Sequence, residues 1–403
     1  MRILLVGAGG VGGAVVKIAA RHGFFSRMVV ADYDVERARS AAQGVGDPRF
    51  VPVQADASDQ AAVAALLREH HCDLLLNATD PRFVMSLFRA ALDAGCHYLD
   101  MAMSLSRPHP DRPFEECGVK LGDEQFALAD RWQDRGTLAL LGMGVEPGMS
   151  DVFARHAADE LFDDIEEIGV RDGADLVVEG LAFAPSFSTW TMIEECLNPP
   201  VVYESHRKWY TTEPFSGPEV FEFPEGIGAL ECVNVEHEEV VLIPRQVEAG
   251  RVTFKYGLGS EVIETLKTLQ RLGLDSTDKV RAGGVEVSPR DVVAACLPDP
   301  AAIGPQMRGR TCAGTWVKGR KDGVAREVYL YHVVDNQWSM QEYGAQAVVW
   351  QTAVNPVIAM ELIAENVWTG AGVFGPEAFP ARPFLDRLNA YGSPWHLREH
   401  ACG

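Results

Sequence analysis

The chain has 403 residues, of which 47% are hydrophobic and 23% are charged, so its size suits two globular domains and its composition argues against disorder. Its formal net charge of −21 argues against nucleic acid and anionic lipid as partners, because both require a basic surface. The acidic balance would attract a cationic substrate, although solubility alone also explains it.

The N-terminus begins with a strand-like run rather than a signal peptide, and no uninterrupted apolar run approaches the roughly 20 residues of a membrane span. We therefore expect a cytoplasmic protein without a membrane partner. The eight cysteines show no CxxC spacing and no Cys/His zinc pattern. In a reducing compartment such cysteines are free thiols, so we expect neither disulfides nor a metal.

The N-terminal part alternates between apolar runs, typical of buried strands, and helix-like segments. Strands are expected at 2–6, 28–34, 50–58, 72–81, 97–102 and 137–144, and helices at 15–23, 35–43, 59–70, 82–94, 123–135 and 151–161. Residues 104–122, rich in proline and polar groups, predict a loop. This order predicts an α/β Rossmann domain over residues 1–150, with a doubly wound parallel sheet.

Beyond residue 165 the pattern changes to short strands alternating with helices, with glycine and proline at the joints. Such a pattern predicts an α+β second domain, at residues 151–342, built on an open, mostly antiparallel sheet. From about residue 343 the pattern becomes helical again. Glu194 and Glu195 lie in one predicted helix of the second domain, where a solvated acidic face is the simplest interpretation.

A glycine-rich segment after the first strand, Gly7-Ala8-Gly9-Gly10-Val11-Gly12, fits the G-x-G-x-x-G pattern of dinucleotide binding. The pattern alone is weak, but here it follows a predicted strand and opens a predicted helix. Gly7 would permit the tight turn, Gly9 the approach of a pyrophosphate, and Gly12 close packing of helix and strand. The pyrophosphate would then lie at the helix N-terminus.

Asp32 ends the second predicted strand, twenty residues after Gly12. A carboxylate there accepts from a ribose 2′-hydroxyl and repels a 2′-phosphate, which favours NAD over NADP. Arg37 and Arg39 lie nearby, so NADP stays possible. The alternative is a glycine-rich turn beside a solvated aspartate.

Later strand ends add candidates, since ligands bind beyond the carboxyl ends of such strands. We expect Asp56 and Ala57 to border the adenine, and Asn77, Ala78 and Thr79 to border the ribose or nicotinamide. Ordinary turn chemistry is the alternative for each of these positions.

Three segments resemble the saccharopine dehydrogenase family: the glycine-rich start, Tyr98-Leu99-Asp100-Met101-Ala102, and Gly144-Val145-Glu146-Pro147-Gly148. Segments 190–195, 224–231 and 283–291 look like the lysine 6-dehydrogenase branch. The last third is more similar to the carboxynorspermidine (carboxyspermidine) dehydrogenase branch, at 297–305, 318–323, 329–337 and 372–395. Asp32 departs from that branch, which carries a basic residue after the second strand and prefers NADP.

The resemblance implies that C-terminal helices within 343–403 complete the Rossmann domain and that the second domain mediates a homodimer. It implies NAD(P)-dependent oxidation of a C–H beside an amine nitrogen, or reduction of the corresponding imine. The small-molecule substrate would be an amino acid or a carboxyalkyl-polyamine, with saccharopine or lysine as alternatives. An inactive NAD-binding regulator is the alternative from another class.

Chemistry of this kind needs a proton donor or acceptor near the nitrogen. Asp100, at a strand end, and Glu146, in a turn, are the catalytic candidates, with structural capping and turn formation as their alternatives. In the second domain, Asp172, Glu179 and Trp190 would bind ammonium groups, and Arg171 would bind a carboxylate. The alternative for each of these four is a surface charge or a core aromatic.

Overall fold

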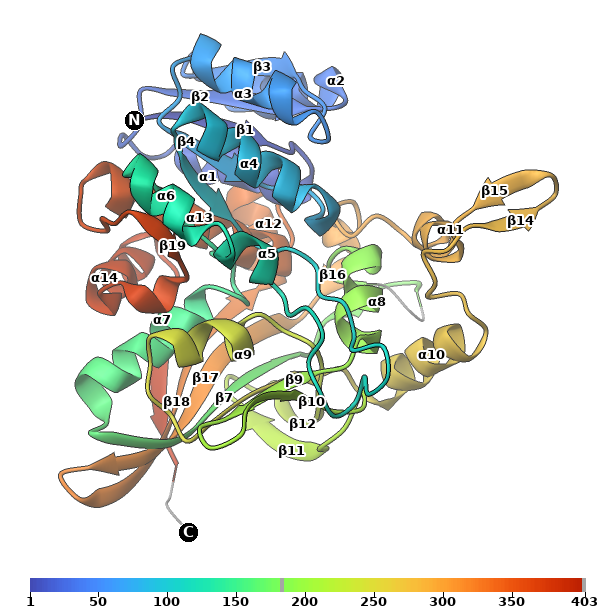
Figure 1. The fold of residues 1–403 in the computed structure, drawn as a ribbon, viewed down its shortest axis with the longest axis vertical. Helices are drawn as coiled ribbons and strands as arrows, with labels where there is room; N and C mark the ends of the chain where they lie inside the picture. The colour runs from blue at the N-terminus through green and yellow to red at the C-terminus, as the bar shows by residue number, and fades with distance from the viewer. Residues whose placement is uncertain (182–184, 401–403) are drawn as a thin grey trace.

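The computed structural model describes residues 1–181 and 185–400 (Figure 1). Its first sheet is entirely parallel, with the strand order β19-β6-β5-β4-β1-β2-β3. The strands are β1 (Arg2–Val6), β2 (Arg27–Asp32), β3 (Phe50–Gln54), β4 (Leu74–Asn77), β5 (His97–Asp100), β6 (Leu138–Leu140) and β19 (Gly372–Phe374). The expected doubly wound sheet is confirmed.

Helices cover both faces of this sheet, because successive side chains of a strand point to opposite faces. Ile3 and Leu5 of β1 pack in one core with α1 and α13, whereas Leu4 and Val6 pack in another with α3 and α4. The helices of this half are α1 (Gly10–Ala19), α2 (Val35–Gly44), α3 (Gln60–Glu69), α4 (Val84–Ala94), α5 (Asp123–Phe126), α6 (Ala129–Arg135), α12 (Asn336–Tyr343), α13 (Ala347–Ala364) and α14 (Ala381–Ala390).

Helix α13 is long and apolar enough, by length and composition, to cross a membrane. However, 83% of it is buried inside the protein, where Trp350, Val354 and Ile358 belong to the main core. It is therefore a core helix, and its residues Val348, Val349 and Thr352 reach the cavity described below.

The second sheet has nine strands, in the order β10-β9-β13-β7-β17-β18-β20, with β12 also paired to β13 and β11 to β12. Among the described strands of this sheet only β13 and β7 pair in parallel, so the expected mostly antiparallel sheet is confirmed. Its strands are β7 (Asp164–Ala174), β9 (Val201–Glu204), β10 (Lys208–Thr211), β11 (Glu219–Phe223), β12 (Gly228–Asn234), β13 (Arg251–Gly257), β17 (Arg310–Lys321), β18 (Val324–Asp335) and β20 (His396–Glu399).

Shorter elements surround the second sheet. The helices are α7 (Met149–His156), α8 (Thr189–Leu197), α9 (Glu239–Leu242), α10 (Ser260–Arg271) and α11 (Pro289–Cys296). The hairpin β14 (Val280–Ala282) and β15 (Val285–Val287) extends away from the body of the protein (Figure 1), and β8 (Val177–Val178) pairs with β16 (Met307–Arg308).

The C-terminal segment returns to both sheets. Strand β19 extends the parallel sheet beside β6, and β20 pairs with β18 at the edge of the second sheet. The resemblance implies that C-terminal helices within 343–403 complete the first domain, but this segment also contains the strand His396–Glu399, which pairs with the second sheet. The four residues of this strand are mostly exposed and show no apolar alternation, so the sequence pattern does not predict the strand.

Candidate active site

A cavity of about 380 Å³ lies between the carboxyl ends of the parallel strands and the second domain. Its walls come from the turn after β1, the turn after β4, the loop at 299–301, helix α13 and the second sheet. The polar lining residues include Asn77, Thr79, Asp80, Glu146, Asp172, Glu195, His237, Glu238 and Tyr256. One cavity therefore combines the predicted cofactor turn with Glu146, one of the two candidate catalytic residues.

The glycine turn has the geometry that the pattern predicts. Gly7 has φ +99°, and a Cβ there would lie 2.4 Å from the Ala78 carbonyl oxygen. At Gly12 a Cβ would lie 1.9 Å from the Gly7 carbonyl oxygen, whereas a Cβ at Gly9 would meet nothing within 4 Å. Gly9, Gly10 and Val11 line the cavity, so the N-terminus of α1 offers an open cradle suited to a pyrophosphate.

Asp32 lies at the end of β2 beside this turn. Its Oδ2 accepts a hydrogen bond from the Ala8 amide over 2.8 Å, and its Oδ1 accepts from the Asp34 amide over 2.9 Å. The nearby basic side chains already have acidic partners: Arg37 lies 3.9 Å from Asp34, and Arg39 pairs with Glu36. The acid that the fingerprint requires is therefore next to the turn.

The turn after β4 forms another wall of the cavity. Asn77, Ala78 and Thr79 all line it, and Asn77 Oδ1 accepts from the Thr79 amide (3.0 Å) and hydroxyl (2.7 Å). Asp56 is exposed, and the Ser58 amide and hydroxyl that bind it lower its pKa. Asp56 and Ala57 lie outside the cavity lining, so their predicted adenine contact has no support from its shape.

Glu146 and Asp172 form a pair of acids in the cavity. Glu146 lies in the turn before α7, Asp172 lies on β7, and both carboxyl groups line the cavity close enough for each to shift the pKa of the other. Burial, followed by the charge of Asp172, raises the pKa of Glu146 well above its usual range. Burial raises the pKa of Asp172, while Glu146, His237 and Tyr256 oppose that rise. Two neighbouring buried carboxyls share a proton, because both cannot ionise at once.

Asp100 lies outside this arrangement. Its Oδ1 accepts from the Gly142 amide over 2.7 Å, and its Oδ2 accepts from Gln125 Nε2 over 2.8 Å. Burial raises its pKa to about 7. Its neighbours Met101 and Ala102, rather than Asp100, line the cavity, so the structure gives Asp100 a role in joining β5, β6 and α5.

Three of the four predicted substrate contacts also lie elsewhere. Arg171 is on the face of β7 opposite Asp172, where its Nε lies 2.5 Å from Glu219 Oε1. Glu179 is exposed, 3.8 Å from Arg308. Trp190 is buried outside the cavity lining, with the guanidinium groups of Arg82 and Arg290 against its ring at 4.8 and 4.7 Å.

The cavity also contains residues that sequence reasoning missed: Glu195, His237, Glu238 and Tyr256. The solvated acidic face expected at Glu194 and Glu195 is wrong, because Glu194 pairs with buried Arg290 and Glu195 lines the cavity. The only signal in the sequence was the run Glu236-His237-Glu238-Glu239, an unusual density of titratable groups.

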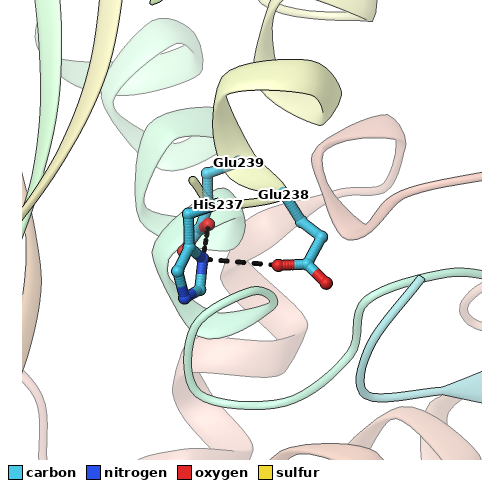
Figure 2. A group of neighbouring side chains, drawn as sticks. All are labelled: His237, Glu238 and Glu239. Carbon is cyan, nitrogen blue, oxygen red and sulfur yellow. Dashed lines mark hydrogen bonds and ion pairs between the residues drawn. The ribbon is translucent and has the colours of Figure 1, made fainter. Parts of the chain in front are cut away.

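This run places a histidine among carboxylates. His237 Nδ1 lies 2.5 Å from Glu239 Oε2 and 3.5 Å from Glu238 Oε2 (Figure 2). Potential ligand atoms of all three residues lie within 4.8 Å of one another. A zinc ion bound at ~2.0–2.2 Å from each atom would hold its ligands farther apart than 2.5 Å. The geometry is therefore that of an ion pair.

The cavity is strongly acidic. Burial raises the pKa of Glu195 to about 8 and that of Glu236, which precedes His237 in the chain but lies outside the lining, to about 7. Among the described residues, the lining contains no lysine or arginine, and His237 is its one basic side chain. The site thus suits a ligand with more ammonium than carboxylate groups.

Comparison with known proteins identifies the family. The saccharopine dehydrogenase NADP binding domain matches residues 3–140, and the saccharopine dehydrogenase C-terminal domain matches residues 144–393. The chain belongs to the saccharopine dehydrogenase family. The expected family and its NAD(P)-dependent oxidoreductase activity are thereby confirmed, and the inactive regulator is not favoured.

Two relatives match this family member over nearly their whole length. Carboxyaminopropylagmatine dehydrogenase from Synechocystis sp. is 30% identical, over 98% of this chain and 97% of that protein. Carboxynorspermidine synthase from Vibrio alginolyticus is 29% identical, over 99% and 97% respectively. The structure of apo saccharopine dehydrogenase (L-Glu forming) from Saccharomyces cerevisiae has a TM-score of 0.71 at 14% identity, covering 99% of this chain and all of that one, which shows the shared fold.

Proposed function

We propose that this oxidoreductase acts on the CH–NH group of a carboxyalkyl-polyamine, by reducing the imine of a cationic amine or by oxidising the resulting secondary amine. The observation that carries the proposal is the acidic cavity, which contains Glu146, Asp172, Glu195 and Glu238 but, in its described lining, no lysine or arginine. Such a cavity attracts ammonium groups and repels polyanions.

Saccharopine is the less suitable substrate. It carries three carboxylates and two amines, and carboxylates are best recognised by arginine. Arg171, the residue expected to bind a carboxylate, instead forms an ion pair with Glu219 on the face of β7 that points away from the cavity. A carboxyalkyl-polyamine instead carries more ammonium than carboxylate groups, and both curated relatives named above are, by their names, enzymes of carboxylated polyamine-like amines.

The protein groups required by the chemistry are present. NAD(H), when bound on the glycine turn, supplies or accepts the hydride at carbon. Imine reduction also needs one proton at nitrogen, and Glu146, which burial and Asp172 keep protonated, is placed to donate it. Asp172 then stabilises the cationic nitrogen, and Tyr256, which lines the same cavity, lies close enough to that carboxylate to lower its pKa. In the oxidative direction Glu146 accepts the proton.

For the cofactor we propose a preference for NAD over NADP. Asp32 is placed to accept from a ribose hydroxyl, and a carboxylate in that position repels a 2′-phosphate. The two nearby arginines have acidic partners and are not free to bind a phosphate without breaking those contacts.

We also propose that the enzyme acts as a homodimer in the cytoplasm. The resemblance to the family supports the dimer. The described cysteines are all free thiols, which suits a reducing compartment.

Turnover of matched substrates tests the proposed function. Carboxynorspermidine and carboxyspermidine are compared with saccharopine and lysine, in both directions and with both cofactors. We expect NAD-dependent turnover of a carboxylated polyamine with kcat/KM at least ~10-fold above that of saccharopine, equivalent to about 1.4 kcal/mol in the transition state. Preference for saccharopine, or silence with both polyamines, would contradict the proposal.

A further inference from the structure

His237 is a cation inside an otherwise acidic cavity. Its Nδ1 is bound to Glu239, whose other oxygen, Oε1, accepts from the Ser150 hydroxyl over 2.8 Å. The ring stacks on Phe254 with the ring centroids 3.8 Å apart and the ring planes 10° from parallel. The imidazole is therefore fixed in position by a carboxylate on one edge and an aromatic ring on one face.

The second ring nitrogen is available to a ligand. Nε2 points away from both glutamates (Figure 2), and no described protein group forms a hydrogen bond with it. His237 lines the cavity, so Nε2 is the ring atom that a bound molecule can reach. With Nδ1 held by Glu239, an imidazolium would present one free N–H donor there.

The surroundings keep this ring charged. The titratable groups that face it are Glu236, Glu238 and Glu239 on its own segment, Asp151 on α7, Asp172 on β7 and Glu195 on α8. Burial alone would lower the pKa of His237, but the neighbouring carboxylates, above all Glu239, raise it to about 10. The ring is thus an imidazolium throughout the neutral range.

A carboxyalkyl-polyamine carries both ammonium groups and a carboxylate, and the cavity must bind both kinds of charge. Its ammonium groups can be matched by Glu195, Glu238 and Asp172, but its carboxylate would be repelled by those same groups. Within the described lining only His237 offers a positive charge to a carboxylate. A charge-assisted hydrogen bond to Nε2–H would offset that repulsion.

We propose that His237 is a specificity-determining residue that binds the carboxylate of the substrate through Nε2–H. The proposal rests on the proposed function, since it assumes a ligand that carries ammonium groups and a carboxylate together. It assigns selection for the carboxylated amine to one side chain, with Glu239 as the positioning residue that holds the ring.

Two probes that differ by the carboxylate test this role: carboxynorspermidine and norspermidine, titrated by calorimetry into the full-length enzyme with NADH present, because NADH cannot react with either amine. We expect the wild type to bind the carboxylated probe about 10- to 100-fold more tightly, the range of a hydrogen bond to a charged group. In His237→Gln, which keeps a neutral donor, the ratio should fall to about 3-fold or less while norspermidine affinity is kept or improved.

Control variants separate this role from a structural one. His206→Gln changes an exposed histidine beside Glu204 and should keep the wild-type ratio. Glu239→Gln keeps the ring in place but removes its main counter-charge, so its ratio should fall between pH 7 and 9, where the wild-type ratio stays constant. Thermal melting and NAD binding verify that each variant folds.

The outcomes distinguish this inference from the proposed function. An unchanged ratio in folded His237→Gln, or a wild type that binds both probes equally or binds neither, would overturn the role of His237. Turnover of a carboxylated polyamine would still support the proposed function in those cases. Absence of turnover together with a ratio that depends on His237 would instead overturn the proposed function alone.

Discussion

The carboxylate of Asp32 accepts a hydrogen bond from the backbone amide of Ala8 over 2.8 Å. This bond joins the end of β2 directly to the glycine-rich turn after β1. Asp32 therefore shapes the turn proposed to receive the pyrophosphate, in addition to its proposed contact with the ribose. The acceptor oxygen of Asp32 holds the turn, whereas its negative charge would act on the cofactor, and substitutions can separate these two effects.

The first prediction separates them with two substitutions of Asp32. Asp32→Asn keeps an acceptor for Ala8 but removes the charge, so kcat/KM with NADPH relative to NADH should rise about 10-fold or more. Asp32→Ala also frees the Ala8 amide and should weaken both cofactors. Steady-state kinetics with both cofactors check this. An unchanged cofactor ratio in both variants would contradict the proposed role of Asp32.

Replacement of Glu146 tests the proton donor. Glu146→Gln cannot exchange a proton, so kcat should fall by about 10²- to 10⁴-fold while KM changes little. The pH limb that reports the Glu146–Asp172 pair should vanish from the kcat profile. The matched control is Glu248→Gln, an exposed glutamate outside the cavity lining, which should behave as the wild type. Retention of the full rate by Glu146→Gln would exclude Glu146 as the donor.

Glu195 and Glu194 are adjacent on α8 and form a matched pair for substrate binding. Burial raises the pKa of Glu195 to about 8, and an ammonium group binds its ionised form. The affinity for norspermidine should therefore rise from pH 6.5 to pH 8.5, with proton release on binding. We expect Glu195→Gln to abolish this rise in calorimetry.

Glu194→Gln serves as the comparison for that experiment. It breaks the ion pair with Arg290, outside the cavity lining, and should lower the melting temperature while keeping the pH dependence of binding. An identical pH dependence in all three proteins would show that Glu195 does not contact the ligand.

Asp100 leads to a prediction about stability. Asp100→Ala leaves the buried Gly142 amide and Gln125 amide without an acceptor, which costs about 1–3 kcal/mol for each group. Asp100→Asn keeps one acceptor oxygen and should cost less. Chemical denaturation measures both changes.

The pH dependence of stability gives a further check on Asp100. Its pKa is raised by burial from the ordinary value to about 7, so the folded state binds more protons than the unfolded state between roughly pH 4 and pH 7. Its contribution to the free energy of unfolding therefore falls as pH rises through that window. The Asp100→Asn variant should lose this part of the wild-type pH dependence, and an unchanged dependence would contradict the assignment.

The parts of the site that depend on local order were predictable from sequence. Gly7, Gly9, Gly12 and Asp32 lie in one strand-turn-helix-strand unit, in which spacing alone fixes the geometry. The fold class was predictable for a similar reason, because long runs of apolar periodicity specify both sheets. The short polar strand β20 lacked such a pattern.

The grouping of the acidic residues and His237 in the cavity could not be predicted in the same way, although Glu146 by itself was a candidate. Glu146, Glu195 and His237 come from separate elements, and only tertiary packing brings them together. Arg171 and Asp172 are neighbours in sequence but lie on opposite faces of β7, and only Asp172 faces the cavity. Which of the two does so depends on the register of the strand, which the sequence alone does not determine.

The return of the chain to both sheets affects how the protein can be made and altered. The edge of the parallel sheet stays open at β6 until Gly372–Phe374 has been synthesised, and the edge of the second sheet stays open at β18 until His396–Glu399 follows. Both halves therefore complete their folding only after the ribosome has released almost the whole chain. Residues 1–150 therefore should not be stable when they are expressed alone. Without β19 the edge of β6 would be unpaired and exposed, which promotes aggregation.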